Sequence, residues 1–400
     1  MTSAPLKIGF RLGAFPKLSE TFIQNQIEAL IERGHMVSVL ADLESDDAAL
    51  ARTPITPDQL SRLTYIQPPN PVLKSALAHL PWRVRATRAA SLEHRLLARN
   101  DVVICHFGWF GVAMAKSLAQ RPARARLVTV FHGADMSSYL REAGQNAYDE
   151  LFHYGDLHLP ISDFWAERLR GMGAPAGRTT VHRMGVWLDR FQFTPRPPSP
   201  GNPLRLVSVG RLVEKKGVRY SLEALDIARR NRPDVDLSLD IVGDGPLREE
   251  LEALSAALGL NDRVSFLGGL PHARVAEILG EADAFVLPSV VAEDGDMEGI
   301  PVALMEAMAS GLPVVSTRHS GIPELVEHGV TGLLAPERDS GALADLFLQL
   351  AETGGAPPSV LEAARHKVEQ DFSNARQYDR LDRLLRELVD KAPTATRSHP

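Results

Sequence analysis

The sequence predicts an α/β protein with two doubly wound parallel sheets, and three observations support this fold class. Short apolar runs alternate with amphipathic segments of helical period on both sides of residues 191–203. Residues 191–203 contain five prolines, a composition typical of a stiff linker. The chain has 400 residues, enough for two domains of roughly 100–200 residues each. We therefore expect one domain over residues 1–190 and a second over residues 204–370.

The first of these domains shows five buried strand patterns, with amphipathic helices between some of them. Gly34 follows the first helix, at the position where glycine commonly ends one. The expected strands are residues 7–10, 37–40, 102–105, 127–131 and 157–160, and the expected helices are residues 22–32, 112–119 and 164–172.

The second domain repeats the alternation of strand and helix. Its expected strands are residues 204–209, 237–242, 264–267, 284–287 and 313–316, and its expected helices are residues 218–230, 246–258, 272–281, 302–310 and 340–352. The tail over residues 359–391 reads as helical, and residues 392–400 read as disordered. Ligands in such sheets bind beyond the carboxyl ends of the strands, so a cleft between two facing domains is the expected site.

Composition places the chain among soluble globular proteins, with 44% hydrophobic and 24% charged residues. The single cysteine, Cys105, excludes an internal disulfide framework and a cysteine-based zinc site. No stretch reaches the roughly 20 apolar residues of a membrane span, and residues 1–7 lack the apolar core of a signal peptide. We therefore expect a cytoplasmic protein, and we expect no nucleic-acid partner.

A basic stretch interrupts the overall charge of −6. Residues 70–126 carry ten Lys or Arg and two Asp or Glu, a local balance of +8. Within it, Trp82, Arg83, Arg85 and Arg88 follow the pattern of a helix lying on an anionic membrane surface. A solvated helix face packed on the first domain explains the same pattern, and the sequence leaves both interpretations open.

The segment from Glu298 to Glu306 carries the strongest signal for a binding site. Pro301 is suited to the first turn of a helix, so Glu298 precedes this helix and Glu306 lies within it. The free N–H groups in the segment Gly299, Ile300, Pro301 and Val302, of which Pro301 itself has none, then form an anion site for a diphosphate. Two carboxylates beside an anion site can hold the ribose and the sugar of one nucleotide-sugar. Ordinary solvated glutamates on a surface helix are the alternative.

Loops after four other strand patterns complete the candidate site. Arg211 and Lys216 lie in a loop flanked by Gly210 and Gly217, where two cations can hold a diphosphate. His132 and Asp135 follow the strand that ends at residue 131, and Asp135 is a candidate contact to the acceptor. The remaining candidates for binding the donor are Gly13, Gly243, Phe266 and Leu267.

Two motifs that suggest other chemistry are set aside. Gly243-Asp-Gly-Pro246 lacks the third glycine of a dinucleotide fingerprint, because Arg248 stands in its place. Asp294-Gly-Asp296 has the form by which some transferases hold a divalent metal, but it lies beside a helix N-terminus that already supplies positive charge. No metal and no cofactor are therefore expected.

Together these motifs resemble glycosyltransferase family four, and within it the exopolysaccharide enzymes of the colanic acid and amylovoran type. The matching segments are residues 15–22, 131–133, 160–163, 183–186, 212–217, 294–306 and 319–326. The resemblance implies the GT-B fold, a retaining transfer and no requirement for metal. It also implies that a C-terminal helix, about residues 371–391, packs back on the first domain.

The same resemblance implies roles for individual residues and for partners. Glu298 and Glu306 correspond to the family's paired glutamates, Arg211 and Lys216 to its diphosphate clamp, and His132 to its sugar-contacting histidine. The donor is then a UDP- or GDP-sugar, and the acceptor is a glycan linked to polyprenyl diphosphate at the inner face of the cytoplasmic membrane. A sugar-nucleotide epimerase, a phosphorylase and a non-catalytic binding subunit are the alternatives.

Overall fold

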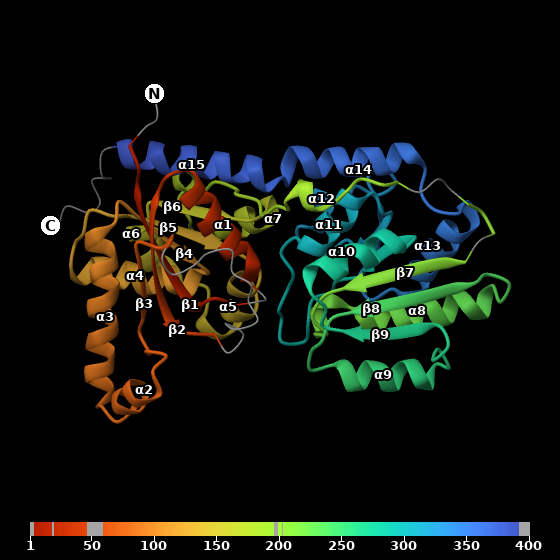
Figure 1. Cartoon of the computed structure of the whole chain (residues 1–400), viewed down its shortest axis with the longest axis horizontal. Helices are drawn as coiled ribbons and strands as arrows, with labels where there is room; N and C mark the ends of the chain where they lie inside the picture. The colour runs from red at the N-terminus through yellow and green to blue at the C-terminus, as the bar shows by residue number, and fades with distance from the viewer. Residues whose placement is uncertain (1–3, 18–19, 46–58, 196–198, 202, 392–400) are drawn as a thin grey trace. The chain divides into compact units, whose positions relative to one another are not determined.

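The computed structural model describes residues 4–17, 20–45, 59–195, 199–201 and 203–391. Part of the expected linker and all of the expected disordered tail lie outside these residues. The chain divides into two compact units (Figure 1). The first contains Met1–Ile161, Trp165–His182 and Tyr378–Pro400, and the second contains Ser162–Phe164 and Arg183–Gln377. Each unit is built around one six-stranded sheet.

The first unit contains a parallel sheet with strand order β3-β2-β1-β4-β5-β6. The order in which the strands are added reverses after β3, because β1 pairs with β2 on one side and with β4 on the other. Its strands are β1 (Lys7–Ala14), β2 (Met36–Leu43), β3 (Arg62–Tyr65), β4 (Val102–His106), β5 (Arg126–Phe131) and β6 (Leu157–Pro160). Every residue of β4, β5 and β6 is buried, as expected for a parallel sheet covered on both faces.

Helices lie in most of the connections between these parallel strands that the structure describes. The helices are α1 (Thr21–Glu32), α2 (Pro71–Ala78), α3 (Trp82–Arg99), α4 (Gly108–Gln120), α5 (Ser138–Ala143), α6 (Asp149–Tyr154) and, after the last strand, α7 (Asp163–Gly171). The helix α2 has no buried residue. Both α2 and the start of α3 extend beyond the edge of the sheet (Figure 1). No helix among the described residues is long and apolar enough to cross a bilayer.

The second unit repeats the topology of the first, with strand order β12-β11-β10-β7-β8-β9. Alternate residues of its strands face opposite sides of the sheet, since Phe285 and Leu287 belong to one apolar cluster and Ala284 and Val286 to the other. The strands are β7 (Leu204–Val209), β8 (Leu237–Val242), β9 (Val264–Gly268), β10 (Ala284–Leu287), β11 (Val314–Thr317) and β12 (Leu333–Ala335).

Helices cover both faces of this second sheet, one set against each apolar cluster. They are α8 (Val218–Asn231), α9 (Arg248–Ala257), α10 (His272–Glu281), α11 (Val302–Ser310), α12 (Ile322–Leu325), α13 (Ser340–Thr353) and α14 (Pro358–Asp371). The last helix, α15 (Asn374–Asp390), belongs to the first unit from Tyr378 onward. Both sheets therefore confirm the predicted doubly wound α/β class.

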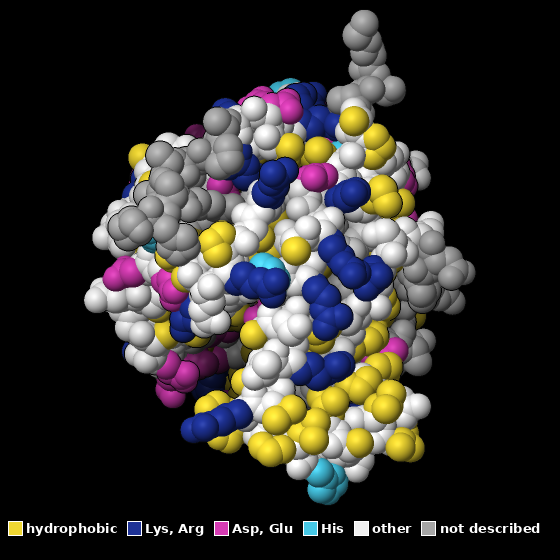
Figure 2. Space-filling model, turned by 90° about the vertical axis from the view of Figure 1, so that its left-hand side faces the viewer, with side chains coloured by type: hydrophobic (Ala, Val, Ile, Leu, Met, Phe, Trp, Pro, Cys, Tyr) yellow, Lys and Arg dark blue, Asp and Glu magenta, His cyan; other side chains and the backbone are white. Residues whose placement is uncertain are grey.

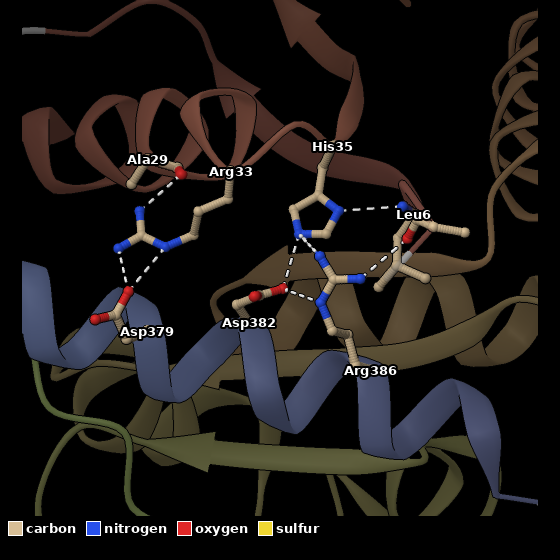
Figure 3. Close-up of polar contacts among 8 residues, drawn as sticks. Leu6, Ala29, Arg33, His35, Asp379, Asp382 and Arg386 are labelled. Carbon is tan, nitrogen blue, oxygen red and sulfur yellow. Dashed lines mark hydrogen bonds and ion pairs between the residues drawn. The ribbon is translucent and has the colours of Figure 1, made fainter. Parts of the chain in front are cut away.

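The C-terminal part of α15 is bound to the first unit by a polar network (Figure 3). The Arg33 guanidinium contacts Asp379 Oδ1 at 2.6 Å, and His35 Nε2 lies 2.8 Å from Asp382 Oδ1. The amide of Leu6 donates to His35 Nδ1, so the ring proton of a neutral His35 lies on Nε2 and points at the carboxylate. Burial lowers the pKa of His35, although Asp382 opposes this shift.

We expect Leu385→Ala to destabilise the first unit by about 2–5 kcal/mol. Leu385 is fully buried, so truncating its side chain leaves a cavity in a packed core. Chemical denaturation followed by fluorescence measures this difference. Glu387→Ala, an exposed position on the same helix, is the control and should change stability by less than about 0.5 kcal/mol. Equal effects of the two variants would contradict the placement of α15.

Candidate functional site

A cluster of charges in the second unit joins two lysines to Glu298. Lys215 and Lys216 belong to a 3-10 turn, Glu214–Lys216, that follows β7, and Glu298 lies in the loop between β10 and α11. Lys216 Nζ is 3.1 Å from Glu298 Oε2, and Lys215 Nζ is 3.7 Å from Glu298 Oε1. Both loops leave the carboxyl ends of strands, where ligands of doubly wound sheets bind.

Glu298 is held as a charged carboxylate despite its burial. The residue is 8% exposed, and burial alone would raise its pKa. The ammonium groups of Lys216 and Lys215 outweigh burial, so the pKa of Glu298 lies below its usual value. Oε1 is enclosed and accepts no hydrogen bond within the described part of the chain. A buried acceptor of this kind is suited to a hydroxyl donor from a ligand.

A second contact orients the backbone of Glu298. Its amide donates to Nε2 of the buried His319 at 3.0 Å. Since Nε2 is the acceptor, His319 Nδ1 carries the proton and donates to Glu337 Oε1 at 2.7 Å. His319 follows β11, so three loops at one edge of the sheet meet at Glu298.

The N-terminus of α11 supplies unpaired amides next to this carboxylate. Pro301 is the cap residue, and α11 begins at Val302, as the sequence predicts. The amides of Gly299, Ile300 and Val302 have no acceptor among the residues that the structure describes. Arg211 is exposed and pairs with no described carboxylate. These donors and the helix dipole together suit a diphosphate.

Glu306 lies one turn into α11 and has a partner that sequence reasoning did not identify. His272 Nε2 is 3.0 Å from Glu306 Oε1. The hydrogen bond to Glu306 is the main cause that raises the pKa of His272. The side chain of Glu306 is only 12% exposed. One carboxylate oxygen of Glu306 is therefore occupied in this structure.

Two glycines allow close backbone approach around the lysine turn. Gly217 adopts φ 67°, and a Cβ there would lie 1.9 Å from Pro288 O. Gly243 adopts φ 135°, and a Cβ there would lie 1.9 Å from Gly210 O. No other amino acid fits either position without moving the backbone. Phe266 is partly buried and Leu267 is exposed, both on the edge strand β9.

Three predicted residues of the first unit, His132, Asp135 and Gly13, lie at the carboxyl edge of its own sheet. His132 directly follows β5 and is 6% exposed. The Asp135 carboxylate accepts hydrogen bonds from the amides of His132 and Gly108, and its side chain is fully buried. Asp135 thus holds the loop and offers no surface to an acceptor. Gly13 lies against the Phe110 ring, since a Cβ there would approach it to 3.2 Å.

The structure adds Lys215, His319 and His272 to the predicted residues, and also His106, whose Nδ1 lies 3.1 Å from His132 Nε2. Lys215 also binds Asp296 Oδ2 at 2.9 Å, which engages one acid of the Asp-Gly-Asp motif. The adjacent Lys216 is the sequence signal that points to Lys215. His272, by contrast, is 34 residues from Glu306 and carries no local signal.

We expect the pKa of His272 to fall toward 6.5 in Glu306→Gln, because the carboxylate that raises it is lost. In the wild type the contact contributes fully below about pH 6.5 and is lost as the pH rises through the raised pKa. Histidine NMR titration measures both values. Glu277→Gln is the control, since Glu277 pairs with Arg274. A pKa of His272 that is unchanged in Glu306→Gln would contradict the contact.

Two family models match most of the chain. The model described as glycosyl transferases group 1 matches residues 189–367, and the model described as glycosyl transferase 4-like domain matches residues 19–185.

Curated relatives match over nearly the full length. The chain is 42% identical to the putative colanic acid biosynthesis glycosyltransferase WcaL of Escherichia coli strain K12, over 92% of this chain and 96% of that protein. It is 38% identical to the amylovoran biosynthesis glycosyltransferase AmsK of Erwinia amylovora, over 96% of this chain and 100% of that protein.

Solved structures share the fold at lower identity. HepE of Anabaena, solved with UDP, has a TM-score of 0.73 at 21% identity and covers 96% of this chain, with 100% of HepE covered. The lipopolysaccharide outer core galactosyltransferase WaaB has a TM-score of 0.71 at 20% identity, over 96% of this chain and 99% of WaaB. The predicted GT-B fold is thereby confirmed.

Proposed function

Because the chain belongs to the glycosyl transferases group 1 family, we propose that it is a retaining hexosyltransferase of exopolysaccharide biosynthesis. It moves a galactose, glucose or mannose unit from a nucleoside diphosphate sugar to a lipid-linked oligosaccharide. The observation that carries this proposal is the buried, charged Glu298 beside Lys216 and the free amides of α11. The carboxylate suits the sugar hydroxyls of a glycosyl diphosphate, and the lysine and amides suit its phosphates.

The cations and amides stabilise the leaving group. As the bond between the sugar and the diphosphate breaks, negative charge develops on the phosphate oxygens. Arg211, Lys216 and the N-terminus of α11 bind that charge, so no metal is required. Glu298 Oε1 accepts a hydrogen bond from a sugar hydroxyl, and Glu306 accepts one from the ribose, displacing His272. Glu298 Oε1 is thus free to accept before the donor binds, whereas Glu306 must exchange its partner.

Retention follows from attack on the face that the diphosphate leaves. No carboxylate is assigned as a covalent nucleophile, and a phosphate oxygen of the donor takes the proton of the attacking hydroxyl. His132 of the first unit contacts a hydroxyl of the transferred sugar. The WcaL and AmsK proteins, by their names, act in colanic acid and amylovoran biosynthesis, which supports a glycan as the acceptor. We propose that this glycan is carried on polyprenyl diphosphate.

We expect Lys216→Ala to lower kcat by about 10²–10³-fold, since one charged donor to the leaving group is lost. The fold should remain intact, because Lys215 still pairs with Glu298. Transfer from radiolabelled nucleotide-sugar to a lipid-linked acceptor measures the rate, and circular dichroism checks the fold. Arg230→Ala removes an exposed cation from α8 and is the matched control. Because the proposed mechanism requires no metal, turnover of the wild type should also persist in excess EDTA. Near-normal turnover of Lys216→Ala would contradict the assignment.

We expect one nucleotide base to raise the melting temperature far more than the other in a panel of UDP- and GDP-sugars. A ligand at about 100 times its Kd adds ~2.7 kcal/mol of stability. HepE was solved with UDP and UDP-glucose, and a mycobacterial relative at 28% identity is named as GDP-mannose-dependent, so both bases are tested. Isomerisation of the donor without acceptor would instead favour an epimerase.

The α2–α3 surface supports peripheral association with the inner face of the cytoplasmic membrane. Five of the nine large hydrophobic side chains exposed among the described residues lie here: Val72, Leu73, Leu80, Trp82 and Val84. Figure 2 shows basic side chains along α3 leading to hydrophobic ones over α2. The only acid between residues 70 and 99 is Glu93, which is buried and binds Arg11 Nε at 3.0 Å. Apolar anchors beside unopposed cations suit anionic lipid.

We expect the triple variant Arg83→Gln, Arg85→Gln, Arg88→Gln to bind vesicles with anionic phosphatidylglycerol about 10²-fold more weakly, at about 1 kcal/mol per cation. Vesicle sedimentation measures the partition, and added salt should weaken it. The triple variant Arg229→Gln, Arg230→Gln, Arg232→Gln is the charge-matched control on the second unit. Equal binding to neutral phosphatidylcholine vesicles would contradict a charge-driven surface.

A further inference from the structure

Two buried histidines and a glutamine form a hydrogen-bonded chain in the first unit. His106 ends β4, His132 follows β5, and Gln26 lies on α1. His106 Nε2 is 2.8 Å from Gln26 Oε1, and His106 Nδ1 is 3.1 Å from His132 Nε2. All three side chains are almost fully buried. These hydrogen bonds therefore link Gln26 and His106 to His132, the residue that follows β5.

Both histidines are neutral, so each carries one ring proton. Burial lowers the pKa of His106 well below its usual value, and His132 and His182 lower it further. Burial also lowers the pKa of His132 to about 3, with a contribution from His182. A neutral imidazole has one nitrogen that donates and one that accepts. The partner of one nitrogen therefore decides the role of the other.

The positions of the protons follow from Gln26. Its Oε1 can only accept, so the proton of His106 lies on Nε2, and His106 Nδ1 is an acceptor. The group that donates to His106 Nδ1 must then be His132 Nε2. We propose that Gln26, acting through His106, fixes His132 in the tautomer that carries its proton on Nε2. His132 Nδ1, which has no partner among the described residues, then presents a lone pair.

Packing holds the His132 ring in one orientation, which a fixed tautomer requires. The rings of Phe22 and Phe107 lie 4.9 and 4.7 Å from the His132 ring, centre to centre. Phe107 adopts φ 75°, a strained backbone for a residue with a side chain. The amide of the next residue, Gly108, donates to Asp135, which also binds the His132 amide. Asp135 thus stabilises the strained turn and the backbone of His132 together.

The fixed tautomer defines what His132 does with a ligand, and this step rests on the proposed hexosyltransferase function. His132 Nδ1 accepts a hydrogen bond from a hydroxyl of the transferred sugar. It does not donate a proton to the leaving diphosphate. Gln26 and His106 are positioning residues, because they act on the sugar only through His132.

NMR of the protein labelled with ¹⁵N-histidine tests this inference directly. Long-range ¹H–¹⁵N spectra distinguish a protonated ring nitrogen from a bare one, and His132→Asn and His106→Asn assign the signals. We expect the wild-type His132 to carry its proton on Nε2 without any ligand. Gln26→Leu should leave His106 free to exchange tautomers, so the His132 signals should move toward a mixture. Transfer should fall by roughly three- to tenfold in kcat/KM.

Gln24→Leu is the matched control, since Gln24 is equally buried on the same helix but donates to Lys17 O instead. It should leave the His132 tautomer and kcat/KM unchanged. A proton on His132 Nδ1 in the wild type, or an unchanged tautomer in Gln26→Leu, overturns the inference. The spectra need no substrate, so a protein that lacks hexosyl transfer but shows the expected tautomer would overturn only the proposed function.

Discussion

The pairing of the Glu298 carboxylate with Lys215 and Lys216 is the interaction on which the site of the second unit depends. A buried carboxylate without a partner would take up a proton, and removing one member of such a pair typically costs about 3–5 kcal/mol. The lysines reach Glu298 only because the turn after β7 brings them there, with Gly217 packed against Pro288 O. His319 then binds the amide of the same residue. Loops from three neighbouring strands are thus tied to one carboxylate.

The first unit positions its site residues by a different physical means. Its residues around His132 are neutral histidines and a glutamine, together with Asp135, whose pKa burial raises to about 7. Orientation here comes from hydrogen bonds and ring packing, whereas in the second unit it comes from opposite charges. The two chemistries fit the two proposed tasks, since a diphosphate needs positive charge and a sugar hydroxyl needs a directed acceptor. One topology, repeated in both sheets, supports both.

Much of the fold was predictable because parallel strands are buried on both faces. Residues 204–209, 237–242 and 284–287 form strands with the predicted limits. The third is a continuous apolar run, and the first two are short, mainly apolar runs with interspersed polar residues. The helix at 302–310 also has the predicted limits, because Pro301 and Gly311 mark its ends. The edge strands β3 and β12 were missed. Arg62–Tyr65 is only partly buried and Leu333–Ala335 has three residues, so neither shows a usable pattern.

The sequence by itself determined the fold class, the strands and helices of the core, and the segment that holds Glu298 and Glu306. Local periodicity and turn residues specify these features, and such signals extend over only a few residues. Only the tertiary structure decided which groups those carboxylates meet. The contacts of Glu298 with Lys215 and of Glu306 with His272 join residues far apart in the chain. They arise because the strand order places distant loops at one edge of a sheet, and no local pattern encodes that order.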